Sequence, residues 1–321
     1  MAGILSYESM DAVQNDLFRQ LLHSGDRASP RNLSTKECLA VGFELKNPRR
    51  RCITNTARRW SLPLALGEIC WHLSASNKAA ELEYYAPIWK SFADSRGRIM
   101  GSCYGSRVFS NRQGGSLWSS IQRLLRLDPR TRRAVLVFTD DQGHLDPKCA
   151  DAACATSLQF LIRGNRLHAI ATMRSNDAVW GLPYDVFFFS FLQELMSVEL
   201  GVELGFYSHF VGSLHIYERH LDLAERVLAS KANPDSAEMP QIGSTDGIKQ
   251  FLSAERALRE NKDSDLLESL PPYWRDLGRV LHSYSLSKVV GWADAIKSAQ
   301  VPEPYLTLLM PLVNKATERA A

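Results

Sequence analysis

A lone cysteine precedes a predicted β-hairpin, and a cluster of polar residues follows it. The cysteine is Cys154, and the polar residues are Arg174, Ser175, Asp177 and Asp185. Apolar side chains alternate with others over residues 158–162 and 167–171, and the Gly-Asn pair between the two runs is typical of a tight turn. A thiol nucleophile, an anion-binding cation and a carboxylate near one end of a sheet predict a site for a phosphorylated substrate.

Length and composition predict ample hydrophobic core. The chain has 321 residues, of which 45% are hydrophobic and 23% charged. Its net charge of +3 gives no indication of a surface for nucleic acid or membrane. The six cysteines lack metal-binding spacing, so we expect reduced thiols, no metal and a cytoplasmic location. We find no signal-peptide pattern and no apolar run long enough to span a bilayer.

Hydrophobic periodicity predicts the elements that must position these residues. We expect helices within residues 1–25 and over 62–74, 116–127 and 186–202, and strands over 38–45, 134–138 and 206–217, in addition to the hairpin. Residues 231–249 are rich in Pro, Ser, Gly and Asp and predict a surface loop, and residues 249–321 predict several helices.

Four sequence blocks resemble the core of the thymidylate synthase family, and most closely its cytidylate hydroxymethylase branch. They are the Cys154 strand with Gln159, then MRSND (173–177), GLPYD (181–185) and GSLHIYERH (212–220). The resemblance covers residues 60–220 well, the preceding residues weakly and the C-terminal part hardly at all. It implies an α+β fold, with a large mixed β-sheet flanked by helices, in a homodimer that packs sheet against sheet. We expect a single domain over 1–321, with a catalytic core at about 25–230 and a helical C-terminal extension at about 249–321.

The helix predicted over residues 62–74 is apolar on nearly all sides but contains Glu68. Burial there would raise the pKa of this carboxyl, whereas an amphipathic helix would expose it. The resemblance implies that Glu68 relays protons to the pyrimidine ring through water. It also implies that Tyr104, 36 residues later, lies near the site of proton abstraction.

Several basic residues are candidates for binding a phosphate, because guanidinium groups match phosphate oxygens. The resemblance assigns this role to Arg174 with Ser175, and less firmly to Arg31. It also implies that Arg132 and Arg133 reach across the dimer interface to the substrate of the partner. A solvated turn is the alternative for that arginine pair.

Carbon 5 of a pyrimidine becomes nucleophilic when a thiolate adds to C6, which requires a cysteine activated by positive charge. Cys154 is the candidate and Arg174 the activating charge, although a free cysteine is more often a small buried hydrophobe. The resemblance implies 5,10-methylenetetrahydrofolate as the one-carbon donor. Asp177 would then hold its pterin ring, with Trp89 and Phe92 also at the folate site.

Asp185 bears on which base is bound. A carboxyl group can accept from the N4 amino group of cytosine and, when protonated, donate to N3, whereas an amide complements uracil. Thymidylate synthases carry Asn at the matching position, and the cytidylate hydroxymethylases carry Asp. The alternative is that Asp185 is an N-cap for the next helix. His215 and Tyr217 share one face of a strand and could bind the sugar 3′-hydroxyl or pair in the core.

Two reactions remain possible after C5 attacks the one-carbon unit. Water gives a hydroxymethyl group and tetrahydrofolate, whereas a hydride from the folate gives a methyl group and dihydrofolate. The chain carries Ala-Cys-Ala at 153–155, where thymidylate synthases have Pro-Cys-His, and Ser213 in place of an acid. It also ends in ATERAA without the family's water-excluding tail, which favours water.

We therefore predict a hydroxymethyltransferase acting on the C5 of CMP or dCMP, without distinguishing the two sugars. Reductive methylation of dUMP is the alternative. A third possibility is a catalytically inactive homologue that only binds nucleotides, or one that binds RNA in a second role.

Overall fold

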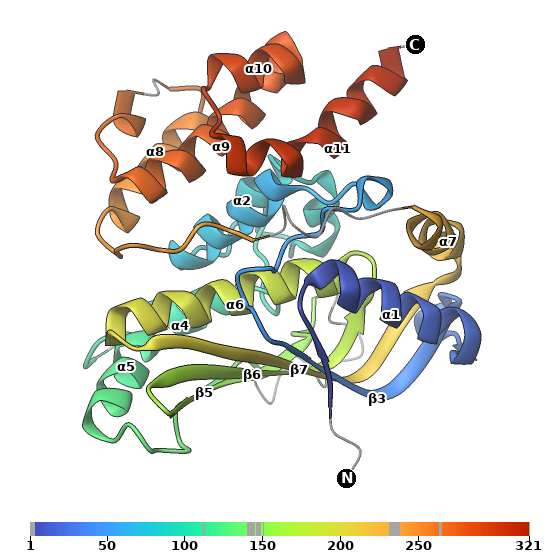
Figure 1. Ribbon diagram of the computed structural model, residues 1–321, viewed down its shortest axis with the longest axis horizontal. Coiled ribbons are helices and arrows are strands. Elements are labelled where there is room, and N and C mark those ends of the chain that lie inside the picture. Colours follow the sequence, from blue (N-terminus) through green and yellow to red (C-terminus); the bar gives the residue numbers. More distant parts are fainter. Residues whose placement is uncertain are drawn as a thin grey trace.

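Seven strands form one mixed β-sheet in the protein (Figure 1). The structure, a computed structural model, describes residues 4–111, 113–139, 145, 149, 151–230, 238–262 and 265–320, with side chains as far as residue 314. The strands are β1 (Leu5–Tyr7), β2 (Asp26–Ala28), β3 (Thr35–Leu45), β4 (Val135–Val137), β5 (Ala155–Arg163), β6 (Arg166–Asp177) and β7 (Glu203–Tyr217). Their order is β1-β3-β7-β6-β5-β4, with β2 beside β3. The β1–β3 and β6–β7 pairs are parallel and the others antiparallel, so the expected mixed sheet is confirmed.

Helices cover one face of this sheet in two layers. They are α1 (Met10–Ser24), α2 (Leu62–Leu73), α3 (Ala79–Glu83), α4 (Tyr104–Phe109), α5 (Leu117–Leu127), α6 (Gly181–Leu200), α7 (Leu221–Ala229), α8 (Ile248–Arg259), α9 (Pro272–Val290), α10 (Trp292–Ser298) and α11 (Glu303–Ala320). Figure 1 shows α1 and α6 along the sheet, α2 above α6, and α8–α11 farthest from the sheet. None of the helices of the described segments is long and apolar enough to cross a membrane.

The predicted hairpin is present and turns at Gly164 and Asn165. Both residues have positive φ, 56° and 61°, as a two-residue turn between twisted strands requires. After β6 the chain crosses through α6 and returns as β7 parallel to β6, which is the usual connection for parallel neighbours. Consequently, the polar end of β6 and the start of α6 lie at the same end of the sheet as Cys154.

The start of α6 differs from the expectation. The sequence predicted a helix from residue 186, but α6 begins at Gly181 and its N-cap residue is Trp180. Asp185 therefore lies within the helix, and the N-cap interpretation of its carboxyl is wrong. The earlier start arises because Pro183 occupies the first turn, where its missing N–H costs no hydrogen bond.

The open face of the sheet carries half-buried apolar side chains. Along β5 and β6, buried residues such as Leu158, Phe160 and Ala169 point to the helices and alternate with the half-buried Leu161 and Ile170. Figure 1 shows no helix stacked below this second face. A sheet that is partly apolar on its open face is suited to cover by another surface.

A buried ion pair connects the segment before α2 to α6. Arg51 Nη2 lies 2.5 Å from Glu194 Oε2, and both side chains are almost fully buried. The other carboxylate oxygen, Oε1, accepts a 2.9 Å hydrogen bond from the Ile242 amide. The guanidinium lies 5.5 Å from the ring centroids of Phe187 and Phe191. Removing one charge would leave the other desolvated without compensation.

Glu194→Gln is therefore expected to lower the free energy of unfolding by about 3–5 kcal/mol, because the isosteric amide leaves the Arg51 charge uncompensated. Urea denaturation at pH 7 measures this value. The matched control is Glu203→Gln, because Glu203 Oε2 lies 3.1 Å from Arg166 Nε in an exposed ion pair. That change should cost no more than about 0.5 kcal/mol, and equal losses in the two variants would contradict the assignment.

Candidate active site

Cys154 lies immediately before β5, beside the guanidinium of Arg174. The Cys154 carbonyl accepts a 2.9 Å hydrogen bond from the Arg174 amide, which ties the two strands together. Arg174 Nη2 is 3.7 Å from Cys154 Sγ, while its Nε and Nη2 donate to the carbonyls of Ala153 and Ala152 at 2.9 and 3.0 Å. A register irregularity follows at residues 155–157, a feature that often redirects side chains near active sites.

Burial raises the pKa of the Cys154 thiol above its ordinary value of 9.0, and the charge of Arg174 only partly opposes this effect. As expected, the charge of Arg174 lowers the pKa of Cys154. The expected net lowering is wrong, because burial raises this pKa by more. The ligand-free thiol is therefore protonated near neutral pH. Its proton must leave as sulfur attacks, which requires a nearby base.

Two carboxyl groups near the thiol have strongly raised pKa values. Burial raises the pKa of Asp185 to about 7, with a hydrogen bond from Asn176 opposing and Asp177 adding to the shift. Burial and the charge of Asp185 raise the pKa of Glu68 to about 8, against a hydrogen bond from the Trp89 indole. Glu68 is half-buried, so neither the fully buried nor the exposed expectation holds, and burial still raises its pKa as predicted. Carboxyls that titrate near neutral pH in a half-buried site are suited to exchanging protons.

Tyr104 begins α4 and places its phenol between these groups. Its oxygen accepts a 3.2 Å hydrogen bond from the Ala155 amide, next to the cysteine. Burial, Asp185 and Cys154 together raise the pKa of Tyr104 well above its ordinary value, so its hydroxyl stays protonated. The Asp151 carboxylate accepts hydrogen bonds from the amides of residues 100–102, which fixes the loop leading to Tyr104.

Polar side chains at the ends of β6 and β7 lie beside the thiol. Ser175 Oγ is 3.4 Å from His215 Nδ1, and the Tyr217 ring meets the His215 ring edge-on at 5.3 Å. Arg31 lies close enough for its charge to lower the pKa of Cys154 and of Tyr217. Its φ of 52° is unusual for a residue other than Gly and sets it within a 3-10 turn, η1 (Pro30–Asn32). The structure thus gathers Arg31 with Arg174 near Cys154 at one end of the sheet.

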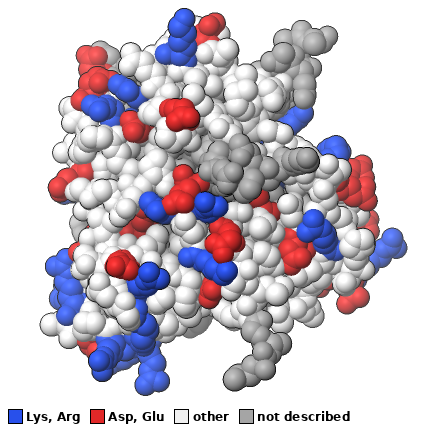
Figure 2. Space-filling view, viewed as in Figure 1, with Lys and Arg blue, Asp and Glu red and all other residues white. Residues whose placement is uncertain are grey.

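Arg132 and Arg133 do not join this group. They lie in the turn before β4, where the Arg132 carbonyl accepts from Gln159 Nε2 at 2.9 Å. Arg132 lines a surface hollow together with Arg130 and Arg163, at the hairpin end of the sheet. Figure 2 shows Lys and Arg side chains gathered at the lower left of this face, where Figure 1 places α5. Within one chain, this pair is remote from Cys154.

The residues expected at the folate site lie on the other side of Glu68. Trp89 and Phe92 belong to a 3-10 helix, η3 (Pro87–Phe92), with ring centroids 5.8 Å apart. Asp177 Oδ1 accepts a 2.8 Å hydrogen bond from the Val179 amide, which leaves Oδ2 available. The Trp180 ring is half exposed and lies over the Arg58 guanidinium at 5.1 Å.

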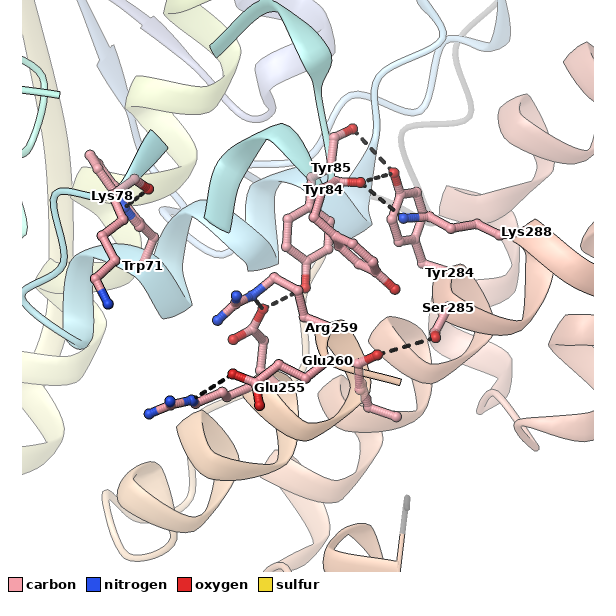
Figure 3. Close-up of polar contacts among 12 residues, drawn as sticks. Trp71, Lys78, Tyr84, Tyr85, Glu255, Arg259, Glu260, Tyr284, Ser285 and Lys288 are labelled. Atoms are coloured by element: carbon pink, nitrogen blue, oxygen red, sulfur yellow. Dashed lines mark hydrogen bonds and ion pairs between the residues drawn. The ribbon is translucent and has the colours of Figure 1, made fainter. Parts of the chain in front are cut away.

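Contacts from α8 and α9 hold the segment that carries Trp89 (Figure 3). Tyr284 Oη donates to the carbonyls of Tyr84 and Tyr85 at 2.9 and 3.2 Å, and Lys288 Nζ donates to the Tyr84 carbonyl at 3.0 Å. The Tyr85 hydroxyl donates to Glu255 Oε1 at 2.9 Å. The C-terminal helices therefore position one wall of the site.

Gly67 lets the same segment pack directly against α2. A Cβ at this position would lie 2.5 Å from the Tyr85 ring, so only glycine permits this approach. Glu68 is the next residue, and the close packing fixes the helix turn from which its carboxyl projects. No local sequence pattern indicates this contact, because Tyr85 and Gly67 lie on separate elements.

Glu68→Gln should raise the stability of the ligand-free protein at alkaline pH. Glu68 ionises at about 8 when folded, against an ordinary value of 4.5, so the folded state is destabilised as pH rises through that window. Above pH 8 the variant should be about 1–2 kcal/mol more stable than the parent, because solvent screens part of the shift. Below pH 4.5 the difference should vanish. Urea denaturation below pH 4.5 and above pH 8 measures this difference in stability. Equal stability of the variant and the parent at pH 9 would contradict the raised pKa of Glu68. Turnover by the same variant should fall by about 10²–10⁴-fold.

Asn176, His209 and Tyr207 are site residues that the sequence did not indicate. Asn176 Nδ2 donates to Asp185 Oδ2 at 2.7 Å. His209 contacts Asn176 and Tyr207 contacts His209, so the chain of hydrogen bonds continues into the core. Among the described residues, no group of three or more His, Cys, Asp or Glu side chains could hold a metal ion.

Comparison with known proteins identifies the family of this chain. The chain is 31% identical over 215 residues to a deoxyuridylate hydroxymethyltransferase of Bacillus phage SP01. That alignment covers 63% of this chain and 55% of the phage protein, so the chain spans about half the length of this relative. A family model described as thymidylate synthase matches residues 14–257, which include every described site residue discussed above. The family expected from the sequence is thus confirmed, and the chain belongs to the thymidylate synthase family.

Proposed function

We propose that this protein is a one-carbon transferase that hydroxymethylates C5 of the cytosine in CMP or dCMP, with 5,10-methylenetetrahydrofolate as donor. The observation that carries the proposal is the half-buried Asp185 carboxyl, whose Oδ2 accepts a 2.7 Å hydrogen bond from Asn176 and whose charge acts on Cys154; burial raises its pKa to about 7. At neutral pH this group can be both a hydrogen-bond acceptor and, when protonated, a donor. That combination matches the N4 amino group and N3 of cytosine.

In the proposed reaction, Arg174, Ser175 and Arg31 bind the phosphate and His215 with Tyr217 binds the sugar. Cys154 Sγ adds to C6, and its proton passes to a nearby carboxylate. C5 then attacks the folate methylene, and the C5 proton leaves toward Glu68 through water. Tetrahydrofolate departs, water adds to the exocyclic methylene, and elimination of the thiol restores the ring. One water molecule is consumed and one tetrahydrofolate is released.

A second candidate substrate is dUMP. It is favoured by the similarity to a protein whose name states deoxyuridylate hydroxymethyltransferase. The same set of residues could also support reductive methylation of dUMP. Asp185 favours cytosine over both uracil reactions, because an ionised carboxylate repels the O4 acceptor of uracil.

Turnover of CMP, dCMP and dUMP side by side with the folate donor tests the proposal. We expect CMP or dCMP to gain one CH2O unit by mass spectrometry, without the absorbance of dihydrofolate. A methylated uracil nucleotide with dihydrofolate would replace the proposal by the reductive reaction. Hydroxymethylation confined to dUMP would retain the reaction type but overturn the base assignment.

We also propose a homodimer through the open face of the sheet. Support comes from the half-buried apolar residues on that face and from Arg132 and Arg133, which are remote from Cys154 within one chain.

Mixing inactive Cys154→Ala and Arg133→Met variants should restore roughly a quarter of the parent activity if the arginine acts on the partner's substrate. Absence of complementation in a mixture shown to exchange subunits would contradict the shared site.

The remaining expectations extend this proposal. We propose that residues 1–321 act as one domain, with the core at about 25–230 and the helices of 249–321 bracing the folate side. The segment 231–237, part of the predicted loop, lies outside the described residues. All six cysteines are unpaired, which supports a reducing, cytoplasmic location. The partners of the protein would be the nucleotide and the folate, and we expect it to bind neither nucleic acid nor membrane.

A further inference from the structure

A chain of three buried side chains ends on the Asp185 carboxyl. Asn176 Nδ2 is 2.7 Å from Asp185 Oδ2, and Asn176 Oδ1 is 3.0 Å from His209 Nε2. His209 Nδ1 is in turn 2.7 Å from the Tyr207 hydroxyl. We call Asn176, His209 and Tyr207 the Asn176 triad. Its members are 0–3% exposed, so water does not compete for these hydrogen bonds.

The hydrogen bonds of the triad have one consistent direction. Burial lowers the pKa of His209 to about 3, so its ring is neutral and carries one N–H. Among the described residues, the Tyr207 hydroxyl has His209 Nδ1 as its one hydrogen-bond partner, so the hydroxyl donates to that nitrogen. His209 then donates from Nε2 to the Asn176 carbonyl, and the Asn176 amide donates to Asp185. The reverse direction would leave the buried hydroxyl hydrogen of Tyr207 without an acceptor, which is costly.

Packing keeps the central ring of the triad in place. The His209 ring stacks on Phe43 from β3, with centroids 5.2 Å apart and planes at 23°. Asn176 and His209 lie on the parallel neighbours β6 and β7, where His209 pairs with Ala171 and Asn176 with Leu214, so their side chains meet diagonally across the two strands. A rotation of the imidazole would therefore lose both the stacking and two hydrogen bonds at once.

We propose that the Asn176 triad fixes which oxygen of Asp185 carries the proton and thereby sets the preference for one pyrimidine edge. Because Oδ2 accepts from the amide, the acid proton belongs on Oδ1, and the carboxyl presents one fixed donor and one fixed acceptor. A base held over Cys154 has a fixed orientation, so one edge finds complementary partners. The edge of the other pyrimidine places its donor against the donor of the Asp185 carboxyl and its acceptor against the acceptor of that carboxyl. Asn176, His209 and Tyr207 are positioning residues, since they act through Asp185.

This inference rests on the proposed function, in which the favoured edge is that of cytosine. Tyr207→Phe removes only the hydroxyl that sets the direction. We expect it to reduce the ratio of kcat/KM for the better cytosine nucleotide over dUMP by about tenfold, equivalent to one net hydrogen bond. Asn176→Leu should reduce the ratio further, because the amide itself is lost.

The matched control is Tyr305→Phe, whose buried hydroxyl has no hydrogen-bond partner among the described residues. This variant should keep the parent ratio and melting temperature. An unchanged ratio in both Tyr207→Phe and Asn176→Leu, with folding intact, would overturn the proposal. A loss of kcat without a change in the ratio would also overturn it, since a merely structural role predicts that result.

A spectroscopic measurement tests the triad without turnover. In protein labelled with ¹⁵N-histidine, the His209 ring should carry its proton on Nε2 throughout the pH range 5–9. A proton on Nδ1 would refute the assigned direction even if the variants failed to fold. The two failures are separable: a parent enzyme that prefers dUMP refutes the proposed substrate, whereas unchanged preference in the variants or a proton on His209 Nδ1 refutes the role of the triad.

Discussion

Replacing Cys154 with alanine is expected to reduce turnover of every nucleotide by at least about 10⁴-fold, because the reaction loses its nucleophile. Without addition at C6, C5 stays too weak a nucleophile to attack the folate methylene. The fold should persist, since the thiol is half-buried and forms only a 3.9 Å contact to a carbonyl and a 3.7 Å contact to Arg174. Product formation by mass spectrometry and thermal melting measure the two effects.

The matched control is Cys38→Ala. Cys38 is also half-buried and unpaired, but it lies on β3, which β7 separates from β6. Its loss should leave turnover within a factor of about two. Nucleotide binding by the Cys154→Ala protein should persist as well, because the phosphate contacts of Arg174 and Ser175 do not need the thiol. Near-normal turnover in that variant would refute the covalent mechanism.

The second large effect is expected at Asp185. Asp185→Asn exchanges a carboxyl for an amide that cannot take up a proton, so it can no longer donate to N3 while accepting from N4. We expect kcat/KM for the cytosine nucleotides to fall by about 10²–10³-fold and that for dUMP to rise, since buried polar groups left unpaired reject the wrong ligand strongly. Steady-state kinetics on CMP, dCMP and dUMP measures the exchange.

Asp276→Asn is the control for this change. Asp276 is a half-buried acid on α9, outside the site, and burial raises its pKa as well. Its replacement should leave the base preference unaltered. If Asp185→Asn also leaves the preference unaltered, Asp185 does not read the base, and both the substrate assignment and the role of the Asn176 triad fall.

The sequence predicted the sheet end on which the site is built because the relevant signals are local. Period-two alternation and the Gly-Asn turn defined β5 and β6, and an apolar helix with a single acid defined α2 and Glu68. Family resemblance then supplied roles for Cys154 and Arg174, which the structure places 3.7 Å apart.

The remaining features depend on contacts between distant segments, for which a single sequence carries no signal. Asn176 and His209 are 33 residues apart and meet through side chains of the neighbouring strands β6 and β7. The contact of Tyr85 with Glu255 spans 170 residues. The start of α6 was placed five residues late because Gly181 and Pro183 suggest a turn locally, whereas packing on the sheet extends the helix. The net rise in the pKa of Cys154 likewise depends on burial, which only the fold reveals.

The most direct measurement uses 5-fluoro-CMP and 5-fluoro-dCMP with 5,10-methylenetetrahydrofolate. Fluorine at C5 cannot leave as a proton does, so the adduct should accumulate with Cys154 bonded to C6 and the folate methylene bonded to C5. Peptide mass spectrometry should find one nucleotide and one folate on the peptide that contains Cys154. Normal turnover of CMP or dCMP without such an adduct, or the adduct on a different cysteine, would contradict the account.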